Sequence, residues 1–405
     1  MKIETVGNTQ NQNGPRRPFF CHIATALSGL ALLIQVTAVS AVQYTYTANI
    51  GLSQIRDDNI GLRTSGDQSV FGQRLNSDAS LAFTTDRNNG TLSATITENR
   101  LSDHKEYEAN SKSLNATDDI NFEQGHWGFN GGYLESSTLS EGEKSGQAVS
   151  VNQGQAQNNL GTQLSYNVTQ RLTPYVQIDW TAVDYAAQAL TAYHDYDRTV
   201  TTAGIQYSLS EKTLLSISGY SDTLNQSASN LVATTDAATL TSKIKLSETF
   251  SLSLKTGKRR TATTISSINQ PVHFATNGRL FSLDISDKLN SWEWQLSASE
   301  DLTPRFNAVL DKTQKTEAAL GYTYSEKWRW DSSVSRIKRT PESTYYQEYA
   351  TDYLTLVNSI SWMPREKIRV QAQYRYINQQ ITDLQSNAYS NYLGITVGWH
   401  FDHKN

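Results

Sequence analysis

Residues 44–53 read YTYTANIGLS, and apolar and polar side chains alternate strictly along this stretch. Tyr46, Ile50 and Leu52 fall on one face of an extended chain, and the small or polar residues between them fall on the other. A repeat of two residues is typical of a β-strand that has one apolar face. The stretch therefore predicts a strand whose two faces meet different environments.

The same alternation recurs along the chain and ends in residues 392–401, YLGITVGWHF. Counting these stretches predicts 18 strands, with 16 as the alternative count. The connections between them alternate between short ones, such as 171–174, and long ones, such as 260–274. This order describes an antiparallel meander whose two ends lie on the short-turn side. We therefore expect an all-β fold, an up-and-down transmembrane β-barrel over residues 42–405.

The composition supports a barrel over other fold classes. Of 405 residues, 37% are hydrophobic and 18% are charged, and the formal net charge is −4. The many aromatic residues and the low net charge argue against disorder, and the scarcity of strong helix formers argues against a helical bundle. A soluble β-sandwich would need long aliphatic side chains on its apolar faces, where this chain also has Ala, Ser, Thr and Gly. No basic block suggests a nucleic-acid partner.

The first 41 residues have the pattern of a secretory signal peptide. Residues 1–18 carry three cationic side chains, residues 19–41 carry no charge, and Val39-Ser40-Ala41 supplies small residues for cleavage. A membrane anchor is the alternative, although Gln35 weakens it. The sole cysteine, Cys21, lies in this leader, so we expect no disulfide, Cys-based zinc site or catalytic thiol in the remaining chain.

Aromatic residues gather near the short turns and the C-terminal end. Trp127, Trp292, Trp328, Trp362 and Trp399 lie within a few residues of these points. Amphipathic aromatic side chains concentrate where a bilayer meets water. These tryptophans therefore predict an aromatic girdle, with outer-membrane lipid and lipopolysaccharide as partners.

Strand parity predicts which charged side chains face the interior of the barrel. The predicted pore-lining residues are Asp179, Lys243, Lys245, Lys255, Glu293, Arg329, Asp331, Arg369 and Arg375. A hydrated wall needs polar side chains in any case. The cationic members of the set also suggest a track for acidic sugars, which the acidic members weaken.

Two connections leave alternatives open. The longest, 137–157, is rich in Gly, Ser, Gln and Asn, and we favour an external loop over an inward constriction. The basic segment 255–260 lies near the external end of its strand and would either contact lipopolysaccharide phosphates or form a solvated rim.

Signals for catalysis are weak. Tyr193-His194-Asp195 resembles the Asp/His pair of outer-membrane proteases, but a tripeptide arises easily by chance. No metal-binding spacing such as H-E-x-x-H occurs. We expect no enzyme, no catalytic residue, no cofactor and no metal site.

Two stretches resemble known families. Tyr392, Ile395, Val397, Trp399 and Phe401 resemble the terminal strand that the bacterial barrel-assembly machinery recognises, although here the chain continues to residue 405.

At the other end, residues 46–53 followed by RDDNI at 56–60 resemble the opening of outer-membrane porins associated with exopolysaccharide export and exosortase-type systems. The resemblance implies a passive channel in a Gram-negative outer membrane, with polysaccharide-export components as partners. A general small-solute porin, or a structural or assembly barrel without transport, is the alternative.

Overall fold

A computed structural model gives the fold. The residues that it describes are 42–62, 69–145, 152–186, 193–226, 230–266, 271–305, 309–342, 349–382 and 386–404. The predicted signal peptide, 1–41, lies outside these residues.

The described chain is almost entirely β-structure. The strands are β1 (Gln43–Asp57), β2 (Val70–Thr84), β3 (Asn88–Leu101), β4 (Ser111–Phe122), β5 (Gly125–Ser137), β6 (Gly154–Tyr166), β7 (Leu172–Tyr185), β8 (Tyr196–Ser210), β9 (Thr213–Gln226), β10 (Leu231–Lys245), β11 (Ser251–Ile265), β12 (Val272–Leu289), β13 (Trp292–Pro304), β14 (Leu310–Ser325), β15 (Trp328–Pro341), β16 (Thr351–Arg365), β17 (Ile368–Ile381) and β18 (Ser386–Lys404). Two short helical segments interrupt them: η1 (Lys105–Tyr107) and α2 (Thr138–Ser145).

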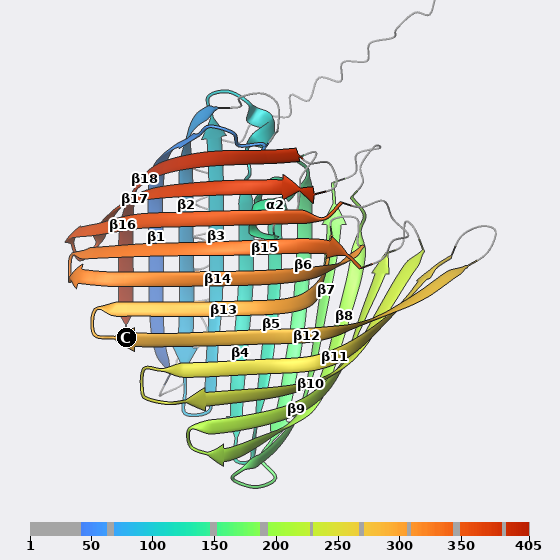
Figure 1. Cartoon of the computed structure of the whole chain (residues 1–405). Coiled ribbons are helices and arrows are strands. Elements are labelled where there is room, and N and C mark those ends of the chain that lie inside the picture. The colour runs from blue at the N-terminus through green and yellow to red at the C-terminus, as the bar shows by residue number, and fades with distance from the viewer. Residues whose placement is uncertain are drawn as a thin grey trace, which may run out of the picture. The chain divides into compact units, whose positions relative to one another are not determined.

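Every strand pairs antiparallel with its neighbours in sequence, and β1 also pairs with β18 (Figure 1). In that closing pair, Ile50 lies opposite Trp399 and Leu52 opposite Val397. The sheet of 18 strands therefore has no free edge, and its backbone groups are hydrogen-bonded within the sheet. The predicted antiparallel barrel is confirmed, with 18 strands rather than 16.

Short and longer connections alternate as predicted, except that the four-residue connection between β9 and β10 is not longer than the five-residue turn between β10 and β11. Turns such as the one between β12 and β13 lie at one end of the barrel, and the longer connections lie at the other (Figure 1). In that turn Asn290 has a φ of 49°, in the left-handed region that asparagine tolerates.

The strands extend further toward the long connections than the sequence predicts. The connection predicted at 260–274 is shorter, because β11 continues to Ile265 and β12 begins at Val272. Apolar alternation marks a strand only where one face meets lipid. Where both faces of a strand are polar, that signal is lost and the strand cannot be seen in the sequence.

Within the described ranges, no helix is both long and apolar enough to cross a bilayer.

Candidate functional site

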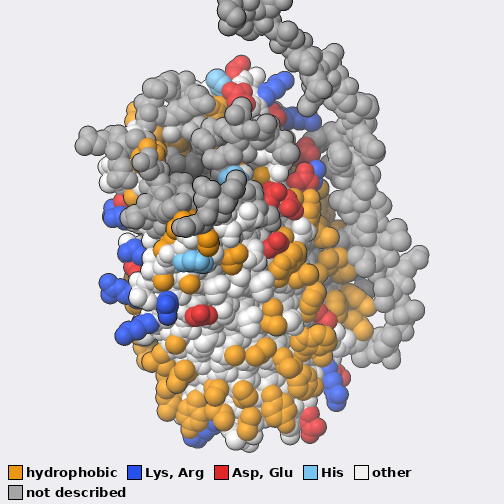
Figure 2. All heavy atoms as spheres, turned by 90° about the vertical axis from the view of Figure 1, so that its right-hand side faces the viewer, with side chains coloured by type: hydrophobic (Ala, Val, Ile, Leu, Met, Phe, Trp, Pro, Cys, Tyr) orange, Lys and Arg blue, Asp and Glu red, His pale blue; other side chains and the backbone are white. Residues whose placement is uncertain are grey.

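The outer face of the barrel is apolar over a broad belt. Exposed large side chains on this face include Leu52, Leu164, Ile205, Leu240 and Ile395. Figure 2 shows hydrophobic side chains gathered over the lower part of the face in view, with charged ones mainly above and beside them. A soluble monomer rarely exposes so extensive an apolar surface, whereas a bilayer covers it.

The protein is a membrane-spanning β-barrel. Even-stranded antiparallel barrels with short turns at one end and longer loops at the other lie in bacterial outer membranes, with the longer loops outside. The chain therefore belongs in a bacterial outer membrane, with its long connections on the external side.

The five predicted girdle tryptophans all lie exposed on this outer face, toward the short-turn end. Trp328 and Trp362, on adjacent strands, stack with ring centroids 5.8 Å apart. The ring centroid of Trp292 lies 4.3 Å from that of Tyr322 on the next strand. These contacts join the aromatic side chains of neighbouring strands at the level where a bilayer interface would lie.

The register defines the inner face of the barrel, because directly opposed residues on paired strands share a face. All nine predicted pore-lining residues lie on the face opposite the exposed hydrophobic side chains. They come from β7 (Asp179), β10 (Lys243, Lys245), β11 (Lys255), β13 (Glu293), β15 (Arg329, Asp331) and β17 (Arg369, Arg375).

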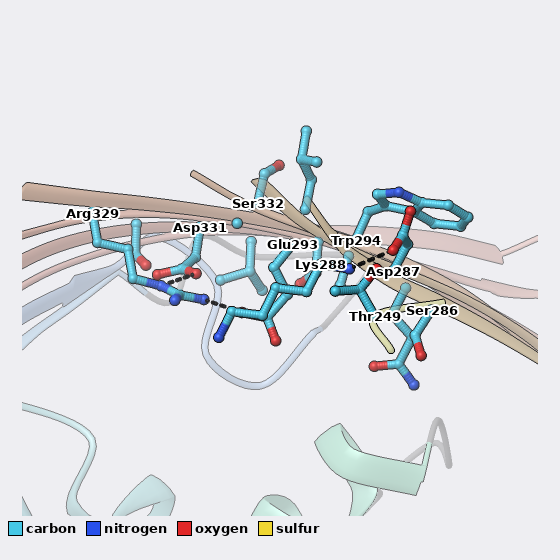
Figure 3. A pocket seen from close by; sticks show the side chains of 16 residues that line it. Thr249, Ser286, Asp287, Lys288, Glu293, Trp294, Arg329, Asp331 and Ser332 are labelled. Carbon is cyan, nitrogen blue, oxygen red and sulfur yellow. Dashed lines mark hydrogen bonds and ion pairs between the residues drawn. The ribbon is translucent and has the colours of Figure 1, made fainter. Parts of the chain in front are cut away.

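Near the short-turn end, the inner wall has a cavity of about 440 Å³. In it the Arg329 guanidinium lies between two carboxylates: its Nε donates to Asp331 Oδ1 at 2.8 Å, and its Nη2 lies 3.4 Å from Glu293 Oε2 (Figure 3). Three of the predicted pore-lining residues therefore form one cluster, in which two carboxylates compensate the single cation.

The other predicted cations differ in how they are compensated. Arg369 Nη2 donates to Ser361 Oγ at 2.7 Å, and Arg375 Nη2 lies 3.8 Å from Asp57 Oδ2. In the described part of the chain, no ion pair involves Lys243, Lys245 or Lys255. Among the predicted pore-lining cations, those without an ion pair in the described residues are thus these three lysines, on β10 and β11, and Arg369 on β17, whose partner Ser361 is neutral.

The connection between β5 and β6 folds inward at the external end. Leu139 of α2 packs with Ile55, Val70, Leu101 and Tyr392, which the register places on the inner faces of β1, β2, β3 and β18. The prediction favoured an external loop over 137–157, and for α2 this was wrong. The buried Leu139 supplies the reason: it removes apolar surface from water by docking against the inner wall.

Hydrogen bonds hold α2 to the neighbouring connection. Asn152 Nδ2 donates to the Glu106 carbonyl of η1 at 2.8 Å, and Asn152 Oδ1 accepts from the Leu139 N–H at 3.3 Å. Gln153 N–H donates to Thr138 Oγ1 at 2.9 Å. Beneath these segments lies a cavity of about 450 Å³, so α2 and η1 narrow the external mouth.

Tyr392 and two arginines line this second cavity. The Arg375 guanidinium lies 4.8 Å from the centre of the Tyr392 ring, and that of Arg74 lies 5.7 Å from it. Tyr392 therefore lies on the inner face. The other four residues of the predicted assembly signal, Ile395, Val397, Trp399 and Phe401, lie on the outer face.

On the side of the mouth away from α2 lie ion pairs that were not predicted from the sequence. Arg259 Nη1 donates to Glu342 Oε1 at 2.8 Å, and Thr276 Oγ1 donates to the same oxygen at 2.7 Å. Arg198 makes a two-point contact with Asp222 at 2.9 and 2.7 Å. Strand parity places both arginines and Asp222 inside, but it does not place Glu342, which lies beyond the end of β15.

A third ion-pair cluster involves β14 and β15. Arg305 Nε donates to Asp311 Oδ2 at 2.6 Å, and Arg339 Nε lies 3.5 Å from the same oxygen. Arg339 Nη2 also hydrogen-bonds Thr303 Oγ1. Because these groups are buried, the ion pairs limit the cost of removing charge from water.

The Glu342 carboxyl has a pKa below its ordinary value. Its burial by itself raises the pKa, but hydrogen bonds from Arg259 and Thr276 and the nearby positive charge outweigh that effect. Glu342 follows β15, in the external connection, so its ionised state stabilises that part of the mouth.

The predicted basic segment 255–260 divides between the two faces. Lys255 and Arg259 face inward, whereas Lys258 and Arg260 face outward. A single rim formed by the whole segment is therefore excluded, because successive residues of a strand point to opposite faces.

Asp195 of the predicted protease-like tripeptide has a structural contact. Its Oδ1 accepts a hydrogen bond from the Tyr185 N–H at 2.7 Å, and the Tyr193 ring lies 5.6 Å from that of Tyr185. The segment thereby holds together the external ends of β7 and β8.

Comparison with known proteins gives structural similarity only. No family model matches the chain, and no curated protein matches it in sequence. Among solved structures, OccK2 (OpdF) of Pseudomonas aeruginosa is 11% identical, with a TM-score of 0.49 over 89% of this chain and 98% of that one. OccAB4 of Acinetobacter baumannii is 10% identical, with a TM-score of 0.46 over 90% and 99% of the respective chains.

Proposed function

We propose that the protein is a passive channel for small hydrophilic solutes across the bacterial outer membrane. The observation that carries the proposal is the contrast between the two faces of one closed sheet. The outer face is apolar, whereas the inner face carries charged, amide and hydroxyl side chains around cavities of about 440 and 450 Å³. A polar lumen in a barrel of this width is hydrated and lets solutes diffuse.

Selectivity would come from charge on the wall. Lys243, Lys245 and Lys255 form a cationic strip on the inner faces of two paired strands, while Arg329 and Arg375 lie close to carboxylates. Charged side chains lining a pore bias it toward ions of opposite sign. We infer a modest preference for anions, which could include acidic sugars.

Passage of an exopolysaccharide is a narrower proposal. Amide side chains on the inner faces of β6 and β7, among them Gln157, Gln163 and Gln177, favour it because amides hydrogen-bond to sugar hydroxyls. Deletion of the gene should then reduce surface polysaccharide, and export components should co-purify with the barrel. If surface polysaccharide is unchanged in the deletion strain, the narrower proposal fails and only the proposal of a general solute channel remains.

Liposome swelling tests the channel directly. Vesicles that contain the full-length protein should swell in isotonic solutions of neutral sugars. The swelling should be slower for larger sugars. Vesicles without protein, and vesicles given heat-unfolded protein, are the controls. If the protein gives no more swelling than the controls, the proposal fails and a structural barrel without transport takes its place.

A further inference from the structure

Three basic side chains lie together on the outer face of β11 and β12. Lys258 is directly opposite Arg279 in the register, and Arg260 is two residues beyond Lys258 toward the external end. All three are exposed, and the Arg279 side chain is 82% exposed. We call these three residues the outer basic strip.

The strip lies at the upper border of the apolar belt. Arg279 is followed on the same face of β12 by Phe281, Leu283 and Ile285, and the strand ends at Leu289. Leu289 lies ten positions after Arg279, which is about 33 Å along a strand and about 25 Å along the axis of a barrel with tilted strands. This is the height of the apolar band of an outer-membrane barrel, so the strip lies where the outer-leaflet headgroups begin.

The strip places two like charges directly opposite each other and has more cations than carboxylates around it. Like charges directly opposite each other on paired strands destabilise a sheet. Glu300 compensates only in part, since its Oε1 lies 3.9 Å from Arg279 Nε. Asp236 lies opposite Arg260 in the register. In the described part of the chain, no ion pair involves Lys258 or Arg260.

We propose that the outer basic strip binds the phosphate groups of lipopolysaccharide in the outer leaflet. A phosphate between Lys258 and Arg279 would accept hydrogen bonds from both and remove their mutual repulsion. Arg260, one step further out, would contact a second phosphate of the same lipid. The external position of the strip favours lipopolysaccharide over the phospholipids of the inner leaflet. The proposal does not depend on what passes through the lumen.

The experiment measures binding of purified full-length protein to three lipids in detergent: bisphosphorylated lipid A, monophosphorylated lipid A and phosphatidylglycerol. The test variant is K258Q/R260Q/R279Q. The control is R56Q/R100Q/K112Q, which removes three outward-facing cations at the external ends of β1, β3 and β4. The heat-dependent shift of each variant on SDS gels checks that the barrel has folded.

We expect wild type to prefer bisphosphorylated lipid A to phosphatidylglycerol, and the test variant to bind lipid A about ten-fold or more weakly. Monophosphorylated lipid A should bind with intermediate affinity, and the control variant should bind like wild type. The proposal would be overturned if wild type and the test variant bound lipid A equally, or if both variants lost lipid A binding to the same extent. It would also be overturned if wild type bound phosphatidylglycerol as tightly as it binds lipid A.

Discussion

Arg259 and Glu342 form a buried ion pair although 83 positions separate them in the sequence, with Arg259 Nη1 2.8 Å from Glu342 Oε1. The side chains are 1% and 13% exposed. The pair joins the inner face of β11 to the connection that follows β15, so it fixes that connection at the external mouth.

Replacing Glu342 by glutamine should destabilise the barrel, because the Arg259 guanidinium then remains buried without a counter-charge. Loss of one partner of a buried pair costs about 3–5 kcal/mol. Urea unfolding in lipid vesicles measures the change in the free energy of unfolding. Glu326→Gln, in the exposed turn between β14 and β15, is the matched control. Equal stability of the two variants would contradict the structural role of the pair.

The contribution of Glu342 should also depend on pH. Its pKa is lower in the folded protein than the value of about 4.3 in an unfolded chain, so its stabilising effect is complete above that value. The effect is lost as the pH falls through the lowered pKa, because the carboxyl is then protonated in both the folded and the unfolded state. The stability difference between wild type and Glu342→Gln should therefore shrink below about pH 4. A difference that stays constant between pH 7 and pH 3 would contradict this assignment.

Loosening α2 should widen the mouth. Leu139→Ala removes most of the apolar contact between α2 and the inner wall, at a cost of about 2–3 kcal/mol for that docking. We expect larger or more variable single-channel currents. Lys105→Ala, on the exposed side of η1, is the control and should leave the current unchanged. If Leu139→Ala conducts like wild type, α2 does not limit passage.

The lysine strip should set ion selectivity. Replacing Lys243, Lys245 and Lys255 together by glutamine should shift the reversal potential in a salt gradient toward cation preference. The control exploits strand parity: Lys258→Gln with Arg260→Gln removes charge from the outer face of the same strand, β11. A shift of equal size in the control would show that charge outside the lumen governs selectivity.

The sequence predicts the strands well where lipid covers one face, because alternation there is strict, as in residues 44–53. It predicts the external ends of β11 and β12 poorly, because both faces are polar beyond the membrane. Parity alone assigns Arg259 to the interior. The position of its partner Glu342 depends on how the connection after β15 folds back. No local sequence pattern encodes that.

The inward packing of α2 could not be predicted for a similar reason. Its sequence, TLSEGEKS, is polar apart from Leu139. The residues that bury Leu139 come from β1, β2, β3 and β18, far away in the chain. Closure of the barrel brings these strands together, and only then does the inner wall offer an apolar site at the mouth.

Single-channel recording of the purified full-length protein in a planar bilayer shows whether the barrel is an open channel. We expect discrete, long-lived current steps that Leu139→Ala alters and Lys105→Ala does not. A correctly folded barrel, verified by its heat-dependent gel shift, that gives no current in either form would contradict the proposed channel function.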